Sequence, residues 1–516
     1  MQYNVIKKFI SPHHVLWHVV AAMEAIMKYY IGADLGTSSL KLLLVDERGN
    51  IASKVSKEYS VNYPAPGWSE QAPETWWDAF VSGIGELLDG FDRSAICGIG
   101  IGGQMHGLVA LDSEDKAIRP CILWNDGRTA KETDYLNKIV GEDFLAENTA
   151  NIAFAGFTAP KLLWMREHEP ENFAKIAKIM LPKDYLNYLL TGVHCCDYSD
   201  ASGMLLLDVG EKKWSEKMLD LCGLTEKQMP KLFESYEIVG NLLPTVAKKL
   251  GLGEIPVVAG AGDNAAAAVG TGTLFAGKCN ISLGTSGTVF IPYDSFKSAE
   301  NNSIHNFCHA NGKFHLMGCI LSAASCNKWF YEDILGTLDY DGEQSAIIDG
   351  DLGRNHVYFL PYLMGERSPI NDVDARGAFI GLRADTERKN MTQAVLEGVA
   401  FAIKENLEIA RSMGVVIEKS TVCGGGARSK IWLKILANVL NMPLEIPVTE
   451  EGPSFGGAML AMVATGEYGS VEDCAKSLLS VKDTIYPNAE IAARYAEQYE
   501  KFEKIYPALK GVFKEI

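Results

Sequence analysis

Residues 29–45 read YYIGADLGTSSLKLLLV, and the Leu-Gly-Thr-Ser of this stretch returns at residues 283–286. Each copy lies between short apolar runs, which predicts a strand, a tight polar turn and a second strand. Glycine lets a ligand approach the backbone, and turn amides with neighbouring hydroxyls suit phosphate oxygens. Two such hairpins, one in each half, indicate a grip on a polyphosphate from both sides. Two ordinary hairpins with Gly-Thr turns would give the same repeat.

The two copies differ at the residue before them. Asp34 precedes the first copy, whereas Ser282 precedes the second. Only the first hairpin offers a carboxylate, and we expect it to steer a magnesium ion.

Length, charge and cysteine content narrow the class of protein. A chain of 516 residues is too long for one ordinary core, so two domains are expected. The net charge of −17, with no Lys/Arg-rich stretch, speaks against nucleic-acid binding. Backbone amides, helix N-termini and a metal ion can still hold a nucleotide. The eleven cysteines show no paired spacing, so we expect buried, reduced thiols and a cytoplasmic protein.

Both halves follow the same plan. Each begins with a hairpin and continues with alternating strands and helices, which predicts two similar α/β lobes with mixed sheets and a ligand cleft between them. The apolar spacing predicts a helix from Pro73-Glu74 and a long helix from Met391 to about Met413. No Pro/Ser-rich linker separates the halves, so the junction near residues 265–275 is predicted to be helical.

The first residues stand apart from this plan. Residues 1–27 hold a mildly apolar stretch that three histidines and Pro12 interrupt. It is too short and too polar to span a membrane and is weak as a signal peptide. We expect a dispensable N-terminal extension.

Two glycine motifs are interpreted as coincidences. Residues 98–103 satisfy GxGxxG, but a strand rather than a helix follows them. Residues 272–279 differ from a P-loop at the last position, where Cys279 replaces the hydroxyl that magnesium requires.

Residues 260–264, Gly-Ala-Gly-Asp-Asn, are a stronger candidate. A carboxylate at the end of a predicted strand, among small residues, can act as a general base toward an alcohol. The alternative is that Asp263 or Asn264 only caps the alanine-rich helix that follows. We expect an ordinary aspartate pKa here, which leaves the group ionised at neutral pH.

Three further blocks are candidates for ligand contact. Residues 424–429, GGGARS, join a strand to a helix and allow a base or ribose to lie flat, although a plain glycine turn is the alternative. The small residues of 452–458 suggest close packing against that loop. Residues 104–107, QMHG, and 124–128, WNDGR, set hydrogen-bonding groups beside apolar surfaces, which suits a polyhydroxylated ligand. The alternative for His106 is a satisfied core histidine.

Taken together and in order, these blocks resemble the FGGY carbohydrate kinases, and among them the bacterial xylulose kinases. The match runs from about residue 28 to about residue 465. It also includes GFTAPKLLW at 156–164, LPKDYL at 181–186, LSAASC at 321–326 and FLPYLMGER at 359–367. Glycerol kinases carry an Arg-Glu pair near the QMHG position, which this chain lacks.

The resemblance implies an α/β fold of two actin/hexokinase-like (ribonuclease H-like) lobes with an interdomain cleft. Residues 28–272 would form the sugar-binding lobe, with the catalytic base at its end, and residues 273–516 the nucleotide-binding lobe. The implied reaction is ATP-dependent phosphorylation of D-xylulose to D-xylulose 5-phosphate, with Mg²⁺. The implied ligands are D-xylulose and MgATP, without nucleic acid or membrane, and a homodimer is a family-level expectation.

Carried over by motif, Asp263 is the catalytic base, and Asp34 helps to hold Mg²⁺ and matters for activity. The implied sugar-site residues are Met105, His106, Trp124, Asn125 and Asn264. The implied nucleotide contacts are Gly36, Thr37, Gly284, Thr285 and Ser286 on the phosphates and Gly425, Gly426 and Ala427 on the adenosine. Ala261 stands where many relatives have glycine.

Two alternatives belong beside this interpretation. One is another FGGY kinase that acts on ribulose, gluconate or glycerol. The other is an actin- or chaperone-like ATPase module, which needs a peptide-binding domain or a polymer surface that the sequence does not indicate.

Overall fold

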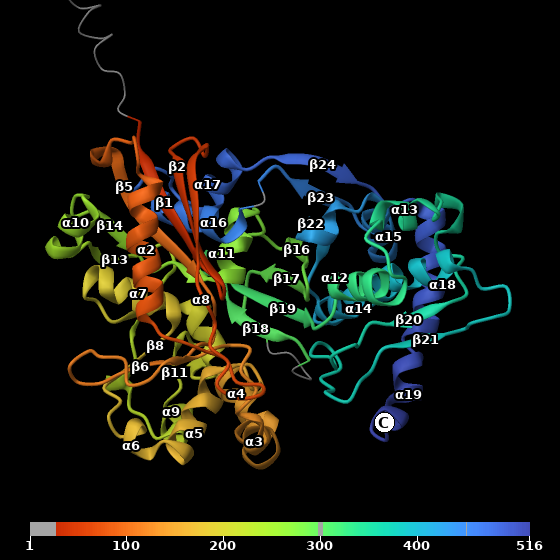
Figure 1. The fold of residues 1–516 in the computed structure, drawn as a ribbon, viewed down its shortest axis with the longest axis horizontal. Coiled ribbons are helices and arrows are strands. Elements are labelled where there is room, and N and C mark those ends of the chain that lie inside the picture. The colour runs from red at the N-terminus through yellow and green to blue at the C-terminus, as the bar shows by residue number, and fades with distance from the viewer. Residues whose placement is uncertain (1–26, 298–302, 450) are drawn as a thin grey trace, which may run out of the picture.

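The computed structural model of the chain describes residues 27–297, 303–449 and 451–516 (Figure 1). The predicted N-terminal extension therefore lies, apart from Met27, outside the described residues. Across the described ranges, no helix is long and apolar enough to span a membrane. All eleven cysteines are free thiols, as expected from their spacing.

The first lobe is built on a seven-stranded mixed sheet in the order β13-β14-β5-β1-β2-β3, with β15 also pairing with β5. The first predicted hairpin forms its centre, where β1 runs antiparallel to β2 and parallel to β5. The strands are β1 (Tyr29–Leu35), β2 (Ser39–Asp46), β3 (Ile51–Glu58), β5 (Ile96–Gly103), β13 (Ile238–Asn241), β14 (Pro256–Val258) and β15 (Ala261–Gly262).

The second lobe repeats this arrangement in the order β18-β19-β17-β16-β22-β23-β24. The second predicted hairpin is again central, since β16 runs antiparallel to β17 and parallel to β22. The strands are β16 (Gly277–Leu283), β17 (Gly287–Tyr293), β18 (His305–Cys308), β19 (Phe314–Ile320), β22 (Ile417–Cys423), β23 (Leu444–Pro447) and β24 (Val481–Ile485). The predicted pair of similar α/β lobes is confirmed.

Helices cover both sheets (Figure 1). The helix predicted from Pro73-Glu74 is α2 (Glu74–Leu87), which buries Trp76, Phe80, Ile84 and Leu87 at helical spacing. The segment between β5 and β13 adds a largely helical region, most of which lies below the first sheet in Figure 1. Its helices are α3 (Ala130–Asp134), α4 (Glu142–Thr149), α5 (Thr158–His168), α6 (Pro170–Phe173), α7 (Pro182–Thr191), α8 (Tyr198–Ala201) and α9 (Glu216–Cys222).

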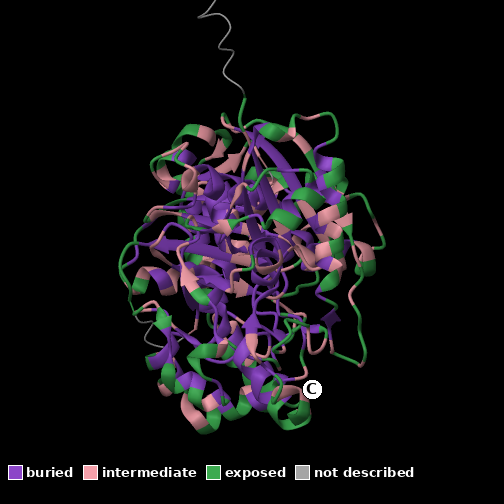
Figure 2. Cartoon of the chain, turned by 90° about the vertical axis from the view of Figure 1, so that its left-hand side faces the viewer, coloured by how far each residue is buried: buried purple, intermediate pink, exposed green. Residues whose placement is uncertain are grey.

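The long helix predicted near 391–413 is α14 (Arg388–Ser412), which packs in the second lobe against β20 (Tyr358–Leu360) and α15. The other helices after β19 are α12 (Ala324–Lys328), α13 (Tyr340–Ser345), α15 (Lys430–Leu440), α16 (Gly452–Ala464), α17 (Val471–Leu478), α18 (Ala489–Phe502) and α19 (Ile505–Phe513). Figure 2 shows that buried residues concentrate in the strands and in the helix faces against them.

Helix α16 crosses back to the first lobe. A Cβ atom on Gly456 would collide with the carbonyl oxygen of Ala266 in α11 (Asp263–Gly270), and one on Gly32 would collide with that of Ser454. The small residues of α16 therefore allow close packing against α11 and the first sheet. The expectation that the small residues of α16 pack against the 424–426 loop is wrong. Their partners are α11 and the first sheet, which are distant in the sequence, so no local pattern indicates the contact.

Candidate active site

Asp34 and Asp263 reach the same end of the first sheet from opposite sides of β5. Asp34, near the end of β1, is in register with Gly102, and β15 places Ala261 and Gly262 beside Gly102 and Gly103. Asp263 follows β15 directly. The carboxyl ends of parallel strands are the usual ligand-binding edge of such a sheet.

Burial perturbs both carboxyl groups. It raises the pKa of Asp34 to about 7, with a further contribution from the charge of Asp263, against which Lys41 acts. It raises the pKa of Asp263 to about 6, while hydrogen bonds from Asn264 act in the opposite direction. The expectation of an ordinary pKa at Asp263 is wrong, because sequence pattern does not report desolvation. Most of the Asp263 population is still ionised at pH 7.

The helix-cap alternative for Asp263 is not what the structure shows. Helix α11 begins at Asp263 itself, and its N-cap is Gly262, without a side-chain cap. The Asp263 carboxylate accepts hydrogen bonds from the backbone N of Asn264, at 2.7 Å, and from its Nδ2, at 2.9 Å. The side chain of Asn264 thus binds the proposed base.

His106 lies at the turn after β5 with a φ of 68°, in the left-handed region. Its Nδ1 is 2.7 Å from the carbonyl oxygen of Gly203, and its ring stacks on Phe157 at 4.7 Å between centroids. Burial lowers the pKa of His106 to about 3, so the ring is neutral. Nδ1 therefore carries the proton, and Nε2 is left as an acceptor.

Met105 connects this turn to the proposed base. A Cβ atom on Gly262 would stand 3.0 Å from Met105 Cγ, so the thioether side chain lies directly over the residue that precedes Asp263. The structure thus brings Met105 and His106 together with the Asp263 turn.

Trp124 and Asn125 are both exposed, but they have different surroundings. The indole Nε1 of Trp124 donates to Thr37 Oγ1 at 2.9 Å, which joins the WNDGR block to the first hairpin. Asn125 instead lines a hollow of about 540 Å³ together with residues 63–69. Its role toward a sugar stays a prediction.

The two hairpin turns are braced through their carbonyl groups. Tyr59 Oη donates to the Gly36 oxygen at 2.6 Å, and Gln71 Nε2 donates to the Thr37 oxygen at 2.7 Å. In the second turn, the Gly284 oxygen accepts from the N of Ala324, and the Thr285 oxygen accepts from the N of Ala323, both at 2.9 Å. The neighbouring Ser286 is half-buried. Both turns are thus held in place by other elements.

A hollow of about 450 Å³ adjoins the second hairpin. Its lining comes from the hairpin, from α12 and α13, from the GGGARS loop and from α15: Thr285, Ala324, Ser325, Asn327, Lys328, Tyr340, Asp341, Gln344, Gly425, Gly426, Arg428, Ser429 and Trp432. A Cβ atom on Gly425 would meet nothing within 4 Å, so the backbone there faces open space. Ala427 is half-buried against the core of the second lobe.

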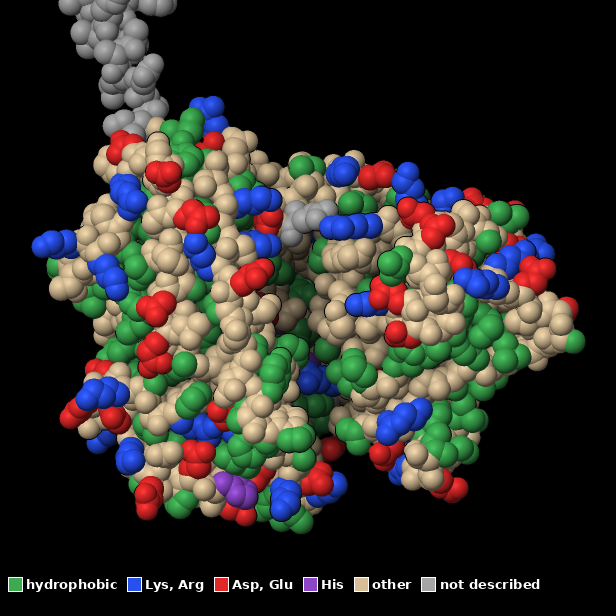
Figure 3. Space-filling view, viewed as in Figure 1, with side chains coloured by type: hydrophobic (Ala, Val, Ile, Leu, Met, Phe, Trp, Pro, Cys, Tyr) green, Lys and Arg blue, Asp and Glu red, His purple; other side chains and the backbone are tan. Residues whose placement is uncertain are grey.

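Arg367, within the FLPYLMGER block, is a residue to which sequence reasoning assigned no role. Its guanidinium carbon lies 5.2 Å from the ring centroid of Phe154, so an arginine of the second lobe reaches the first. Its charge contributes to the lowered pKa values of His106 and His305, behind the effect of burial. Figure 3 shows the groove between the two lobes.

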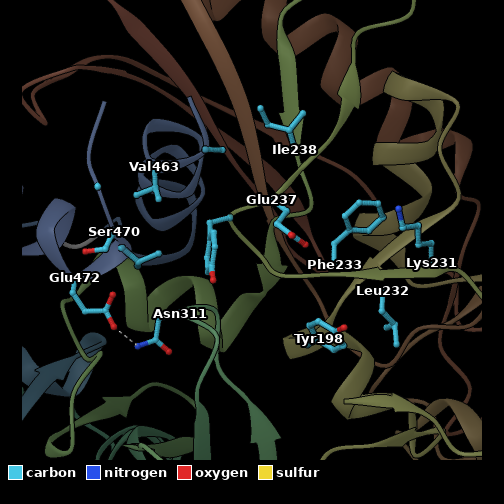
Figure 4. A pocket seen from close by; sticks show the side chains of 14 residues that line it. Tyr198, Lys231, Leu232, Phe233, Glu237, Ile238, Asn311, Val463, Ser470 and Glu472 are labelled. Atoms are coloured by element: carbon cyan, nitrogen blue, oxygen red, sulfur yellow. Dashed lines mark hydrogen bonds between the residues drawn. The ribbon is translucent and has the colours of Figure 1, made fainter. Parts of the chain in front are cut away.

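Size alone does not locate the site. A larger hollow, of about 790 Å³, is lined by Tyr198, Lys231 and Glu237 of the first lobe and by Asn311 and Glu472 (Figure 4). It contains none of the residues that the motifs single out. The better guides are the two carboxylates at the end of the first sheet and the hollow between the second hairpin and the glycine loop.

Comparison with known proteins places these features in a family. Residues 29–270 match the N-terminal domain, and residues 279–465 the C-terminal domain, of the FGGY family of carbohydrate kinases. The chain is 41% identical to a xylulose kinase of Escherichia coli K12, over 93% of this chain and 99% of that protein.

Solved structures agree with this result. A crystal structure from Brucella ovis, named a xyloylose kinase, superposes with a TM-score of 0.90 at 42% identity, covering 94% of this chain and all of that one. A gluconate kinase from Lactobacillus acidophilus has the same TM-score at 25% identity, covering 95% and 99%.

Proposed function

The chain belongs to the FGGY family of carbohydrate kinases, and we propose that it transfers the γ-phosphoryl group of ATP to the 5-hydroxyl group of D-xylulose. The identity to the E. coli xylulose kinase over nearly the full length of both chains carries the choice of sugar. The convergence of Asp34 and Asp263 supports the choice of site.

In this proposal Asp263 is the general base. The sugar hydroxyl oxygen attacks the γ-phosphorus, the bond from that phosphorus to the β–γ bridging oxygen breaks, and ADP leaves. Asp263 accepts the hydroxyl proton. A pKa of about 6 keeps the group mostly ionised at pH 7, yet makes it a stronger base than an ordinary aspartate.

Met105 and His106 would form the wall of the sugar site. The neutral His106 offers its Nε2 lone pair to a sugar hydroxyl, because Nδ1 is committed to Gly203. Groups fixed in this way align the substrate, and phosphoryl transfer depends mainly on alignment and charge stabilisation.

Asp34 suits a magnesium ion that is shared with the phosphates. Mg²⁺ prefers oxygen ligands and commonly uses one or two carboxylates plus substrate phosphates. Within the described part of the chain, the group of three potential metal ligands is Glu132, Glu167 and His168, without Asp34, so the chain itself does not enclose an ion there. When bound, the ion neutralises charge on the phosphate oxygens.

The nucleotide would occupy the second lobe. The hollow of about 450 Å³ between Thr285 and the GGGARS loop is of a size that suits an adenosine, and the open face of Gly425 suits a flat base. Gly36 and Thr37 on one side and Gly284, Thr285 and Ser286 on the other would then contact the phosphates.

One assay separates this proposal from its alternatives. ADP release is measured with MgATP and, in turn, D-xylulose, D-ribulose, D-gluconate, glycerol or no acceptor. We expect the highest kcat/KM with D-xylulose and very little release without an acceptor. A preference for gluconate would favour the activity named for the L. acidophilus structure, and release that ignores every acceptor would favour an ATPase.

A further inference from the structure

Lys183, at the start of α7, is fully buried with three carboxylates. Its Nζ lies 2.6 Å from Asp184 Oδ1, 3.1 Å from Asp197 Oδ1 and 3.7 Å from Asp200 Oδ2, and all four side chains have 0% exposure. Removing charges from water is costly unless they are paired and hydrogen-bonded. The proposed reaction does not use these groups directly, so their contacts need another account.

Two members of this cluster hold the segment that leads to Asp263. Lys183 Nζ donates to the carbonyl oxygen of Ala259 at 3.2 Å. Asp197 Oδ2 accepts from Ser199 N at 2.9 Å, from Ser199 Oγ at 2.5 Å and from Ser235 Oγ at 2.7 Å. Lys183 therefore holds the backbone at Ala259, and Asp197 holds Ser199 and Ser235.

Ser199 passes this restraint to the peptide before the proposed base. Its hydroxyl proton is directed to Asp197, so its oxygen is free to accept a hydrogen bond from elsewhere. The backbone N of Gly262 donates to that oxygen at 3.1 Å. A continuous chain of contacts thus runs from Lys183 through Asp197 and Ser199 to the residue adjacent to Asp263.

The rest of the segment is held just as firmly. Gly260 N donates to the Ser235 oxygen at 3.0 Å, and Asn187 Nδ2 donates to the Ala259 oxygen at 2.9 Å. The Asp263 carboxylate, by contrast, accepts from its own neighbour Asn264, which moves with it. The direction of the carboxylate is therefore set by the backbone of residues 259–262.

We propose that Ser199 is a positioning residue, which with Asp197 and Lys183 holds the Gly262 peptide so that the Asp263 carboxylate points at the sugar hydroxyl. This inference rests on the proposed function of Asp263 as the base. It predicts a loss of turnover when the Ser199 oxygen is removed, beyond any loss of stability.

The test compares Ser199→Ala with Ser235→Ala. Both variants remove a buried hydroxyl that donates to the same Asp197 oxygen, so both are expected to lower Tm to a similar extent. Only Ser199→Ala removes the acceptor of Gly262 N. A Lys183 variant is unsuitable, since it would leave three buried acids without their counter-charge.

We expect kcat to fall roughly ten- to hundredfold in Ser199→Ala, because small misplacements of a reacting group cost up to about a hundredfold. The KM for ATP should stay near that of the unaltered protein, and Ser235→Ala should keep its kcat. Turnover is referred to the concentration of folded protein, measured by ATP binding, so partial misfolding lowers the number of sites and not kcat. Equal kcat values in the two folded variants would overturn the inference.

A second arm separates this inference from the proposed function. In an Asp263→Ala background, Ser199→Ala should not lower the residual rate further, since the group that it positions is gone. A further loss of similar size there would show that Ser199 acts elsewhere and would also overturn the inference. Normal turnover of Asp263→Ala alone would instead contradict the proposed function.

Discussion

Asp34 and Asp263 are adjacent carboxyl groups whose pKa values burial raises to about 7 and about 6. The charge of Asp263 adds to the effect of burial on Asp34, so Asp34 is the harder of the two groups to ionise. One has a counter-charge in Lys41, and the other has hydrogen bonds from Asn264. The lower pKa of Asp263 suits a proton acceptor at neutral pH, whereas a cation bound beside Asp34 would favour the ionised form of that group.

Replacing the proposed base tests its role directly. Asp263→Ala should lower kcat by about a hundredfold or more, because a positioned general base contributes on this scale. The dissociation constant for ATP, measured by calorimetry, should change little, since the hollow that we propose for adenosine lies in the second lobe. Asp263→Asn, which keeps the shape, should be similarly impaired; near-normal turnover in either variant would refute the assignment.

The raised pKa also predicts the pH dependence. Asp263 accepts a proton only when ionised, so activity is lost as pH falls through its pKa. We expect kcat/KM to decline about tenfold per unit below pH ~6, rather than below the ordinary value near pH ~4. The measurement is a profile of kcat/KM from pH 4.5 to 8, with circular dichroism to confirm folding. A flat profile down to pH 4.5 would contradict the proposed base.

At the scale of elements, the turns that we propose to contact the ligands are held in place by the elements around them. The 424–426 turn shows both functions of glycine. Gly425 faces open space beside the hollow of about 450 Å³, whereas a Cβ atom on Gly426 would stand 2.8 Å from atoms of Leu283 and Trp432. Gly425 thus borders the site that we propose for adenosine, whereas Gly426 allows close packing against the core.

Two alanine substitutions in this turn should therefore affect different properties, one the binding of ATP and the other the stability of the fold. Gly425→Ala should leave Tm nearly unchanged and raise the KM for ATP several-fold, since its methyl group enters the hollow. Gly426→Ala should lower stability by roughly 1–3 kcal/mol, the usual range for overpacking. Thermal melts and ATP kinetics measure both, and an unchanged KM in a folded Gly425→Ala protein would argue against adenosine at this turn.

At the scale of the whole molecule, the two lobes are joined through the α11–α16 contact and face each other across a groove (Figure 3). Arg367 extends from the second lobe over Phe154 of the first, next to the buried His305. We therefore expect the second lobe to supply a hydrogen-bond donor to the sugar.

Arg367→Gln should raise the KM for D-xylulose about tenfold or more, in line with the loss of a hydrogen bond from a charged group. The KM for ATP should change little. Arg376→Gln is the matched control, because Arg376 donates to the carbonyl oxygens of Val373 and Ala375, its own neighbours in the chain, both at 2.8 Å. If the two variants have the same KM for sugar, Arg367 does not contact it.

Local sequence patterns determined the elements and the architecture. The two hairpins, α2, α14 and the duplicated α/β plan follow from alternation, helical spacing and turn chemistry, which act between residues close in the chain. The same patterns marked Asp34, Asp263 and the glycine loop as chemical candidates. Their proposed roles also relied on the resemblance to a family.

Only the tertiary structure decided which of these residues and elements lie together and how their surroundings change their properties. Strand pairing with β5 brings Asp34 and Asp263 to one sheet edge, although more than two hundred residues separate them in the sequence. Burial shifts their pKa values, α16 packs on the first lobe, and Arg367 crosses the groove. Strand pairing, desolvation and close packing depend on residues that are distant in the chain, so no local pattern records them.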